Sequence, residues 1–289
     1  MAIKKVIKKL NERQTEKINY ERGLSIYKRD DMVQQARFSL NIQEQRVILY
    51  AMAKVKPTDS PFSEYEFDIK HFYALCGIED NSYTRLKKIM LNLKKKVWFL
   101  RLPSGEESAV SWLEVCRLSE KSGKATVGFH RDVMERLTEL AAKDEFYTKY
   151  QLKYILSMSC QYSPRLYELL KSYQKNNFDW YFDVDELKYL LDCQNYTRWP
   201  DFRRFALDPA VEEINKYTDI KVIYSTETEG RKVVRVNFLF KNKSPSKLKE
   251  IEATITAELD GQIDIEEVIK RGEDPEGYSR RRNKFFIED

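Results

Sequence analysis

The sequence has little glycine and almost no histidine, and both shortages limit the chemistry it can perform. Its 289 residues include 9 glycines and 2 histidines, and it has neither a Gly-x-x-x-x-Gly-Lys-Ser/Thr loop nor a Gly-x-Gly-x-x-Gly loop. Such loops cradle phosphate groups with their backbone amides, so a nucleotide-binding loop is not expected. His71 and His130 lie far apart, which removes the His-x-His metal site of rolling-circle nicking enzymes and argues against zinc binding.

Cysteine and long apolar runs are also scarce. The four cysteines, Cys76, Cys116, Cys160 and Cys193, form no Cys-x-x-Cys pair. Isolated cysteines in apolar surroundings are typical of reduced, buried thiols in a cytoplasmic protein. No stretch approaches the roughly 18 uninterrupted apolar residues of a membrane span. Residues 1–9 are basic but lack the apolar core of a secretory signal. We therefore expect a cytoplasmic protein with no membrane partner.

Paired carboxylates are present, but their local pattern explains them without catalysis. Asp183 with Asp185, and Glu212 with Glu213, stand where helix capping and solvated helix faces are typical. Most of the 18 tyrosines follow apolar stripes, where packing is their usual role. We predict that the protein is not an enzyme and has no catalytic residue, metal ligand or cofactor. A DNA-nicking enzyme or nuclease is the less favoured alternative.

Positive charge is plentiful and unevenly distributed. The net charge is +5, yet the segment 244–289 holds 8 basic and 12 acidic residues. Residues 1–243 therefore hold 43 basic and 34 acidic residues, a balance of +9. The excess of basic residues over 1–243 favours a polyanionic partner for that part of the chain, which precedes the acidic segment 244–289.

One pattern of residues occurs twice, and each copy leads into a helix of a kind that fits a DNA groove. Phe67, Asp68, Ile69, Phe72 and Leu75 match Phe182, Asp183, Val184, Leu187 and Leu190 at an offset of 115 positions. Repeats deserve early notice because they define the architecture before any single motif does. A period of this size is that of a domain, so the chain is predicted to hold two related small domains.

Periodicity within each copy predicts the order helix, turn, helix and hairpin, which is the order of a winged helix. In the first copy we expect a capping box at Asn41–Glu44, an N-cap at Asp68 and a helix from Asn81 or Ser82 to Lys96. Its strands are expected at 97–102, 110–118 and 125–129. In the second copy we expect Pro164 in a first helical turn, Asp183 as an N-cap and a wing made of 220–225 and 233–240.

These elements define the predicted fold class: α+β, with two tandem winged-helix domains related by internal duplication. We expect residues 1–29 to form a basic N-terminal arm that is either mobile or a marginal helix. An N-terminal winged-helix domain is expected at 30–145. A C-terminal winged-helix domain is expected at 146–243. The remaining segment, 244–289, is predicted to be a polar acidic tail without a core.

The first predicted DNA-contacting element is the helix near residues 83–96. Tyr83, Leu86, Ile89/Met90, Leu93 and Val97 form one apolar stripe, and no acid occurs between residues 81 and 96. The opposite face holds six basic side chains: Arg85, Lys87, Lys88, Lys94, Lys95 and Lys96. Such a stripe can follow phosphates and release counterions. A solvated surface helix is the alternative, and of the two we favour DNA contact.

The second predicted element is the last helix of the second copy. Phe202, Phe205, Ala206, Ala210, Val211 and Ile214 are expected to face inward, and Pro209 is expected to remove one backbone bond and kink the helix. Arg198, Arg203 and Arg204 cluster at its start, where a recognition helix presents residues to base edges. Arginine can pair with guanine O6 and N7. Arg231 and Lys232 on the hairpin tip are expected to hold a neighbouring phosphate.

These stretches resemble the iteron-binding plasmid replication initiator proteins. The resemblance rests on Tyr196-Thr197-Arg198-Trp199-Pro200-Asp201-Phe202-Arg203-Arg204, on Ala210-Val211-Glu212-Glu213-Ile214-Asn215, and on the hairpin turn through Gly230-Arg231-Lys232. Asp31–Leu40 and Ser163–Leu170 fit the same family, so roughly residues 28–242 are covered. The resemblance implies two winged-helix domains, of which the C-terminal one binds repeated origin sequences most firmly. It also implies that the N-terminal domain serves DNA contact and dimerisation.

The resemblance further implies that monomers initiate replication, while dimers can repress the initiator's own promoter. We therefore expect an initiator that binds double-stranded DNA repeats, exchanges between monomer and dimer, and recruits host proteins such as the replicative helicase. A winged-helix transcriptional repressor without initiator activity is the nearest alternative. A protein-interaction scaffold is another.

Overall fold

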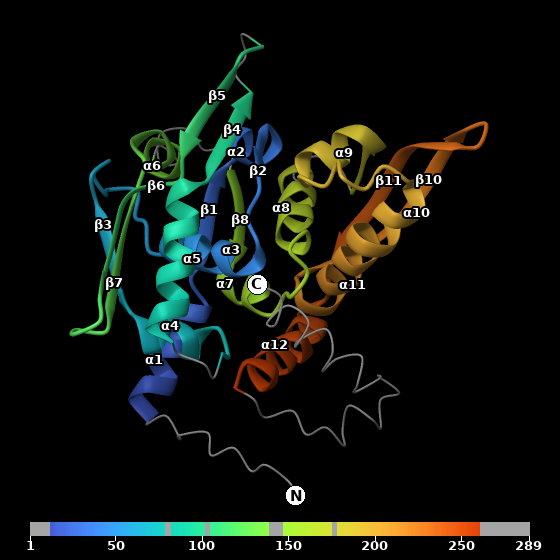
Figure 1. Ribbon diagram of the computed structural model, residues 1–289. Helices are drawn as coiled ribbons and strands as arrows, with labels where there is room; N and C mark the ends of the chain where they lie inside the picture. The colour runs from blue at the N-terminus through green and yellow to red at the C-terminus, as the bar shows by residue number, and fades with distance from the viewer. Residues whose placement is uncertain (1–11, 79–81, 102–104, 139–146, 175–177, 261–289) are drawn as a thin grey trace, which may run out of the picture.

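The computed structural model describes residues 12–78, 82–101, 105–138, 147–174 and 178–260. Buried hydrophobic side chains among these residues form a core cluster that runs through both halves of the molecule. No helix among these residues is long and apolar enough to cross a membrane. Figure 1 shows the two halves side by side, with the N-terminal half in blue to green and the C-terminal half in yellow to red.

The first winged helix is built from a helix, a strand, two further helices and a hairpin. These are α3 (Ile42–Met52), β3 (Glu64–Asp68), α4 (Ile69–Leu75), α5 (Tyr83–Lys95), β6 (Leu113–Ser119) and β7 (Lys124–Phe129). The strands form an antiparallel sheet in the order β3-β7-β6. The hairpin β6–β7 is therefore the wing of this module.

The second winged helix repeats that plan. Its elements are α8 (Ser163–Tyr173), β9 (Asp179–Asp183), α9 (Val184–Leu190), a helical run from Trp199 to Tyr217, β10 (Ile220–Glu229) and β11 (Lys232–Asn242). Its sheet has the order β10-β11-β9, so the first strand again pairs with the last strand of the hairpin. The shared strand order agrees with two tandem winged helices that arose by duplication.

The hairpin that follows α5 directly in the sequence is not the wing. The strands β4 (Val97–Arg101) and β5 (Glu107–Ser111) pair with β2 (Ala36–Phe38) in a separate three-stranded sheet. This sheet reaches the second module, because Arg37 on β2 lies 3.4 Å from the carboxylate of Asp192 and Glu107 on β5 accepts a hydrogen bond from Tyr189. Strands were expected at 97–102, 110–118 and 125–129, and the structure divides the second of these between β5 and β6, since alternation alone does not identify a strand's partner.

The segment predicted as an N-terminal arm is structured from residue 12 onward. Helix α1 (Glu12–Arg22) buries Ile18, and the Arg22 guanidinium donates to the carbonyls of Ala74 and Leu75. Strand β1 (Ser25–Arg29) pairs with β8 (Tyr147–Gln151), so this pair joins the expected arm to a strand beyond residue 145. The first-module side also holds α2 (Asp30–Gln34), α6 (Arg131–Thr138) and α7 (Leu152–Leu156). Residues 1–11 lie outside the described residues.

The segment predicted as a tail without a core begins with a packed helix. Helix α12 (Pro245–Leu259) buries Ile251, Ile255 and Leu259. A Cβ at Gly77 would come within 2.6 Å of the Leu259 carbonyl oxygen, so the chain after α4 approaches α12 closely. An ion pair between Arg22 and Asp260, at 2.7 Å, lies beside this contact. The prediction was wrong for 245–259, because three apolar residues at helical spacing find a surface elsewhere in the fold. Residues 261–289 lie outside the described residues.

Helix caps follow the local sequence closely, with one exception. The Asn41–Glu44 capping box, the Asp68 cap and the Ser82 cap are all present, and Pro164 sits in the first turn of α8. Asp183 precedes α9 but makes no cap hydrogen bond. Its carboxylate lies 3.3 Å from Arg235 on the neighbouring strand β11 instead. A cross-strand cation thus takes the place of the expected cap.

Candidate DNA interface

Helix α5 presents one apolar face to the core and one basic face to solvent. Leu86, Met90 and Leu93 are fully buried, as the spacing predicts. Lys87, Lys88 and Lys95 are exposed, and Arg85 is half-buried. For Lys87 and Lys95 no ion pair is found within the described parts of the chain. These lysines form a set of mobile point charges suited to phosphate contact.

Two of the six basic side chains predicted to contact DNA, Lys94 and Lys96, make contacts within the protein. Lys94 donates to the backbone carbonyls of Leu113 and Glu114 and so ties α5 to the start of β6. Lys96 lies 2.7 Å from the buried carboxylate of Glu44, the residue that completes the capping box of α3. The stripe available to DNA is therefore shorter than the sequence suggested. Its members are Arg85, Lys87, Lys88 and Lys95.

The recognition helix of the second module is a helix of three parts. It begins as α10 (Trp199–Phe202), widens into the π-helical segment η2 (Arg203–Leu207) and continues as α11 (Asp208–Tyr217). The Asp208 amide donates to the carbonyl of Arg203, five residues back. Pro209 has no amide hydrogen and its ring crowds the preceding turn of an α-helix. The wide turn accommodates Pro209 without ending the helix, and π-bulges are frequent at functional sites.

Contacts in its C-terminal part hold this helix in place. Glu213 on α11 accepts hydrogen bonds from the Ser159 amide at 2.9 Å and from the Ser163 hydroxyl at 2.7 Å. At the C-terminus, the Lys243 ammonium donates to the carbonyls of Asn215 and Thr218, which are left without helical partners. Burial lowers the pKa of Lys243 to about 8. Glu213 is therefore a structural residue that fixes α11 to the start of α8.

The three arginines predicted at the start of this helix are all on its surface. The side chain of Arg198 is 75% exposed and lies 3.8 Å from Asp201. The Arg203 side chain is 58% exposed and hydrogen-bonds to Asp208 at 3.1 Å. Arg204 is exposed, with its guanidinium 5.2 Å from the centre of the Phe205 ring. Arg203 and Arg204 help line a shallow depression with Trp199, Pro200 and Asp208.

The inward face of the helix differs from the prediction at one position. Phe202, Ala206, Ala210 and Ile214 are fully buried, but Phe205 is 50% exposed. In a π-helical turn each residue advances less about the axis than in an α-helix, so Ala206 and Leu207 take the inward positions. Phe205 is left on the outer side beside Arg204. The prediction of an inward Phe205 was wrong because it assumed regular helical spacing.

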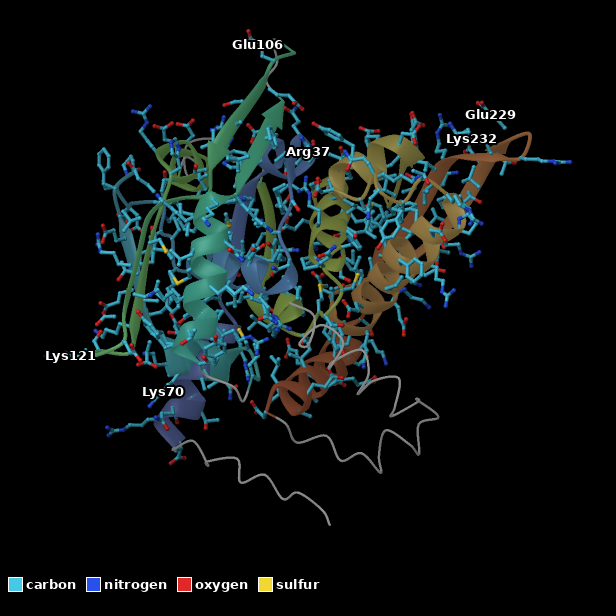
Figure 2. All side chains as sticks on the ribbon, in the orientation of Figure 1. Arg37, Lys70, Glu106, Lys121, Glu229 and Lys232 are labelled. Carbon is cyan, nitrogen blue, oxygen red and sulfur yellow. The ribbon has the colours of Figure 1, made fainter. Side chains whose placement is uncertain are left out.

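The wing of the second module carries Arg231 and Lys232 at its tip, as predicted. Gly230 turns the hairpin with a φ of +59°, and both basic side chains are exposed. Lys232 lies 3.9 Å from Asp185, and Figure 2 shows it at the far end of the hairpin with Glu229. The wing of the first module ends in Lys121, an exposed residue that the sequence reasoning missed. The turn Ser122-Gly123 before the alternating segment 124–129 was the signal for it.

The two candidate DNA-contacting helices share one side of the molecule. Figure 1 shows α5 to the right of β3 and β7, and the run from α10 to α11 alongside β10 and β11, with both helices turned toward the viewer. The wing tips point apart: Figure 2 places Lys121 at the lower left and Lys232 at the upper right. Two winged helices in opposite orientations on one side can extend contacts along a double helix. Within the described residues, no group of three or more His, Cys, Asp or Glu side chains is arranged to hold a metal ion.

Comparison with known proteins agrees with this interpretation. The family model described as "Initiator Replication protein, WH1" matches residues 25–171, and that described as "Initiator Rep protein, WH2" matches residues 183–240. The chain belongs to this family of replication initiator proteins. The first of the two models extends into α8, to residue 171, beyond the domain boundary expected at residue 145.

Two curated proteins of Escherichia coli are similar to this initiator-family chain. It is 31% identical over 208 residues to a protein named "PI protein", covering 66% of each chain. It is 24% identical over 201 residues to a "Replication initiation protein", covering 65% of this chain and 61% of the relative. The chain thus spans just under two thirds of the length of these relatives.

A solved structure is similar as well. It is the crystal structure of the Pi initiator protein in complex with iteron DNA, with a TM-score of 0.64 and 25% sequence identity. The match covers 77% of this chain and 99% of that chain. The arrangement of two winged helices is therefore that of a protein whose structure contains DNA.

Proposed function

We propose that this chain initiates plasmid replication by binding repeated origin sequences, or iterons, through both of its winged helices. The observation that carries the proposal is the placement of two basic recognition helices on one side of the molecule. Family membership and the similarity to an initiator structure that contains iteron DNA support it. The protein acts by binding and has no catalytic step of its own.

The two modules are proposed to make different DNA contacts, because one presents arginines and the other presents lysines. Arginine forms a planar fork that pairs with guanine, whereas lysine is a point charge suited to phosphate. Arg198, Arg203 and Arg204 stand at the start of the C-terminal recognition helix, so that module reads bases. Lys87, Lys88 and Lys95 on α5 contact the backbone. Arg85 on α5, and Arg231 and Lys232 on the second wing, add phosphate contacts at the edges of the site.

We also propose the wider cycle that the family resemblance implies. Monomers bind iterons and start replication, and dimers repress the promoter of the initiator's own gene. The N-terminal module serves dimerisation as well as DNA contact, and the bound protein recruits host replication proteins such as the replicative helicase. Residues 1–243, which carry the excess of positive charge, are proposed to perform these roles, and α12 is separate from the two helices proposed to contact DNA.

Selection from a pool of random double-stranded DNA tests the binding step and identifies the iteron sequence in the same experiment. We expect one preferred site, and a footprint on tandem copies should show both modules protecting each repeat. Retention of random DNA with no preferred sequence would contradict the proposal. Negligible DNA binding at moderate salt would instead favour a protein-interaction scaffold.

Two further experiments separate the proposal from its rivals. A plasmid that carries the repeats and lacks other initiators should be maintained only when the chain is supplied. A protein that represses the promoter but never maintains the plasmid would be a repressor rather than an initiator. Supercoiled origin DNA incubated with the protein and Mg²⁺ should stay uncut, and a nick would favour the nicking-enzyme alternative.

A further inference from the structure

Phe205 has an apolar ring that is exposed on the same surface as Arg203 and Arg204 of the recognition helix. It is 50% exposed although its neighbours Ala206 and Leu207 are fully buried. The π-helical segment turns it outward, so its exposure follows from the backbone and not from a side-chain rotation. An exposed aromatic ring has an unfavourable contact with water that binding can remove.

The ring is held in place by other aromatic side chains. It stacks on Tyr196 with ring centres 6.0 Å apart and planes inclined by 21°. Tyr196 in turn meets Tyr162 edge to face at 6.3 Å, and Tyr162 is only 8% exposed. This chain of rings links Phe205 to the core. A ring that is already ordered loses little conformational entropy on binding.

Phe62 is an exposed phenylalanine without these features. It is 77% exposed and precedes β3, and no aromatic or cationic contact to its ring is found among the described residues. Phe205, by contrast, is ordered by Tyr196 and lies beside the Arg204 guanidinium at 5.2 Å. Phe62 therefore provides the matched control for Phe205.

The major groove offers one apolar group to such a ring. Guanine, cytosine and adenine present hydrogen-bond donors and acceptors at that edge, and thymine adds its 5-methyl group. A phenyl ring neither donates nor accepts a hydrogen bond in the plane of its edge, so the methyl group is its matching partner. Insertion between base pairs, the other use of apolar side chains on DNA, would break the stack on Tyr196.

We propose that Phe205 determines sequence specificity by contacting the 5-methyl group of one thymine in the bound repeat. The proposal rests on the proposed function and extends it from arginine contacts to an apolar contact. The 5.2 Å between the Arg204 guanidinium and the Phe205 ring limits the spacing of the two contacts. Base pairs are about 3.4 Å apart along the axis, so this thymine lies within two base pairs of the guanine that Arg204 contacts.

The test replaces each thymine of the selected site by uracil, one at a time, and so removes only the methyl group. We expect the wild-type protein to lose about fourfold in affinity at one thymine, the value of roughly one buried methyl group. Phe205→Ala should bind the unmodified site more weakly and show no further loss with uracil at that position. Phe205→Leu should keep part of the sensitivity, and Phe62→Ala should behave as the wild type.

The outcomes separate this inference from the proposed function. Uracil sensitivity that persists in Phe205→Ala, or its absence from every position in the wild type, overturns the inference and leaves the proposed function standing. Failure to select any preferred site overturns the proposed function and the inference with it. Thermal unfolding of Phe205→Ala and Phe205→Leu at the wild-type temperature establishes that altered binding is not a folding defect.

Discussion

The two winged-helix modules share their strand order but differ in the helix that we propose contacts DNA. Helix α5 is regular and presents lysines, whereas the helix of the second module is interrupted by a π-helical turn and presents arginines and a phenylalanine. A regular helix is sufficient where its side chains contact only the phosphate backbone of DNA. An interrupted helix can bring Arg203, Arg204 and Phe205 to the surface in succession. We propose that the shared plan of the two modules serves two kinds of DNA contact.

The modules also differ in what surrounds them. The first is extended by the sheet β2-β4-β5, by the pair β1–β8 and by α1, while the second has α12. Helix α8 belongs to the second winged helix, yet its buried Glu168 lies 2.6 Å from Lys28 on β1. The Lys28–Glu168 pair joins the modules through the core. The two modules are thus distinct in surface chemistry but not independent in packing.

Breaking the Lys28–Glu168 pair is expected to have the largest effect. Burial lowers the pKa of Lys28 while Glu168 opposes the shift, and Glu168 also accepts a hydrogen bond from Tyr150. Lys28→Ala leaves a buried carboxylate without its main partner, so we expect a loss of about 3–5 kcal/mol in the free energy of unfolding. Urea denaturation measures it.

A matched surface pair provides the control for this prediction. Lys247 and Glu250 on α12 lie 2.6 Å apart with side chains 58% and 64% exposed. Lys247→Ala should change the free energy of unfolding by about 1 kcal/mol or less. Equal effects of Lys28→Ala and Lys247→Ala would show that the modules are not joined through the buried pair.

Acid should weaken the first module through Glu21. Burial by itself would raise the pKa of Glu21, but hydrogen bonds from His71 and Tyr50 and the charge of Lys54 lower it to about 2. Because the pKa falls on folding, this stabilisation is complete above about pH 4.5 and is lost as the pH falls toward 2. We expect a loss on the order of 2–3 kcal/mol. Urea denaturation of the wild type and Glu21→Gln at several pH values measures it.

The acid effect sharpens the comparison because Glu21 and its partners all lie in the first module. Glu21→Gln should be less stable than the wild type at neutral pH, and the difference should shrink below about pH 4. A difference that stays constant down to about pH 2.5 would contradict the assignment.

Within the second module, Arg204 should contribute more to base recognition than Arg203. Arg203 is already hydrogen-bonded to Asp208, whereas Arg204 lies only against the Phe205 ring in the described structure. Arg204→Ala should cost about 1–3 kcal/mol on the selected site and much less on random DNA. Fluorescence anisotropy with both DNAs measures the two losses. Equal losses on the two DNAs would place Arg204 on a phosphate.

The lysines of the first module should affect the salt dependence of binding more than its specificity. Changing Lys87, Lys88 and Lys95 to alanine together would remove the three phosphate contacts proposed for α5. The slope of log affinity against log salt should flatten by about 2.7. The same three changes to arginine keep the charge and should keep the slope. An unchanged slope in the alanine variant would remove α5 from the interface.

Local features were predicted well from residues close together in the sequence. The Asn41 capping box, the Asp68 and Ser82 caps, and the buried stripe Leu86, Met90, Leu93 all appeared as expected. The exposed Arg198, Arg203 and Arg204 were expected too. These features depend on hydrogen bonds and helical spacing over at most a few turns, so the neighbouring residues are sufficient to define them.

Other features needed partners from distant parts of the chain. Lys94 and Lys96 read as free surface charges, but they bind Leu113, Glu114 and Glu44. Asp183 was predicted to be a helix cap, but its carboxylate forms an ion pair with Arg235. No local pattern reveals which side chain will lie opposite another once strands and helices pack.

The sequence by itself determined the two-module plan, the absence of phosphate-binding loops and the positions of the recognition helices. Only the tertiary structure decided that β6–β7 is the first wing, that α12 packs against the body and that Phe205 faces outward. The physical reason is the range of the forces involved. Caps and amphipathic stripes act between neighbours in the chain, whereas strand pairing, helix docking and the turn around Pro209 depend on surfaces brought together by folding.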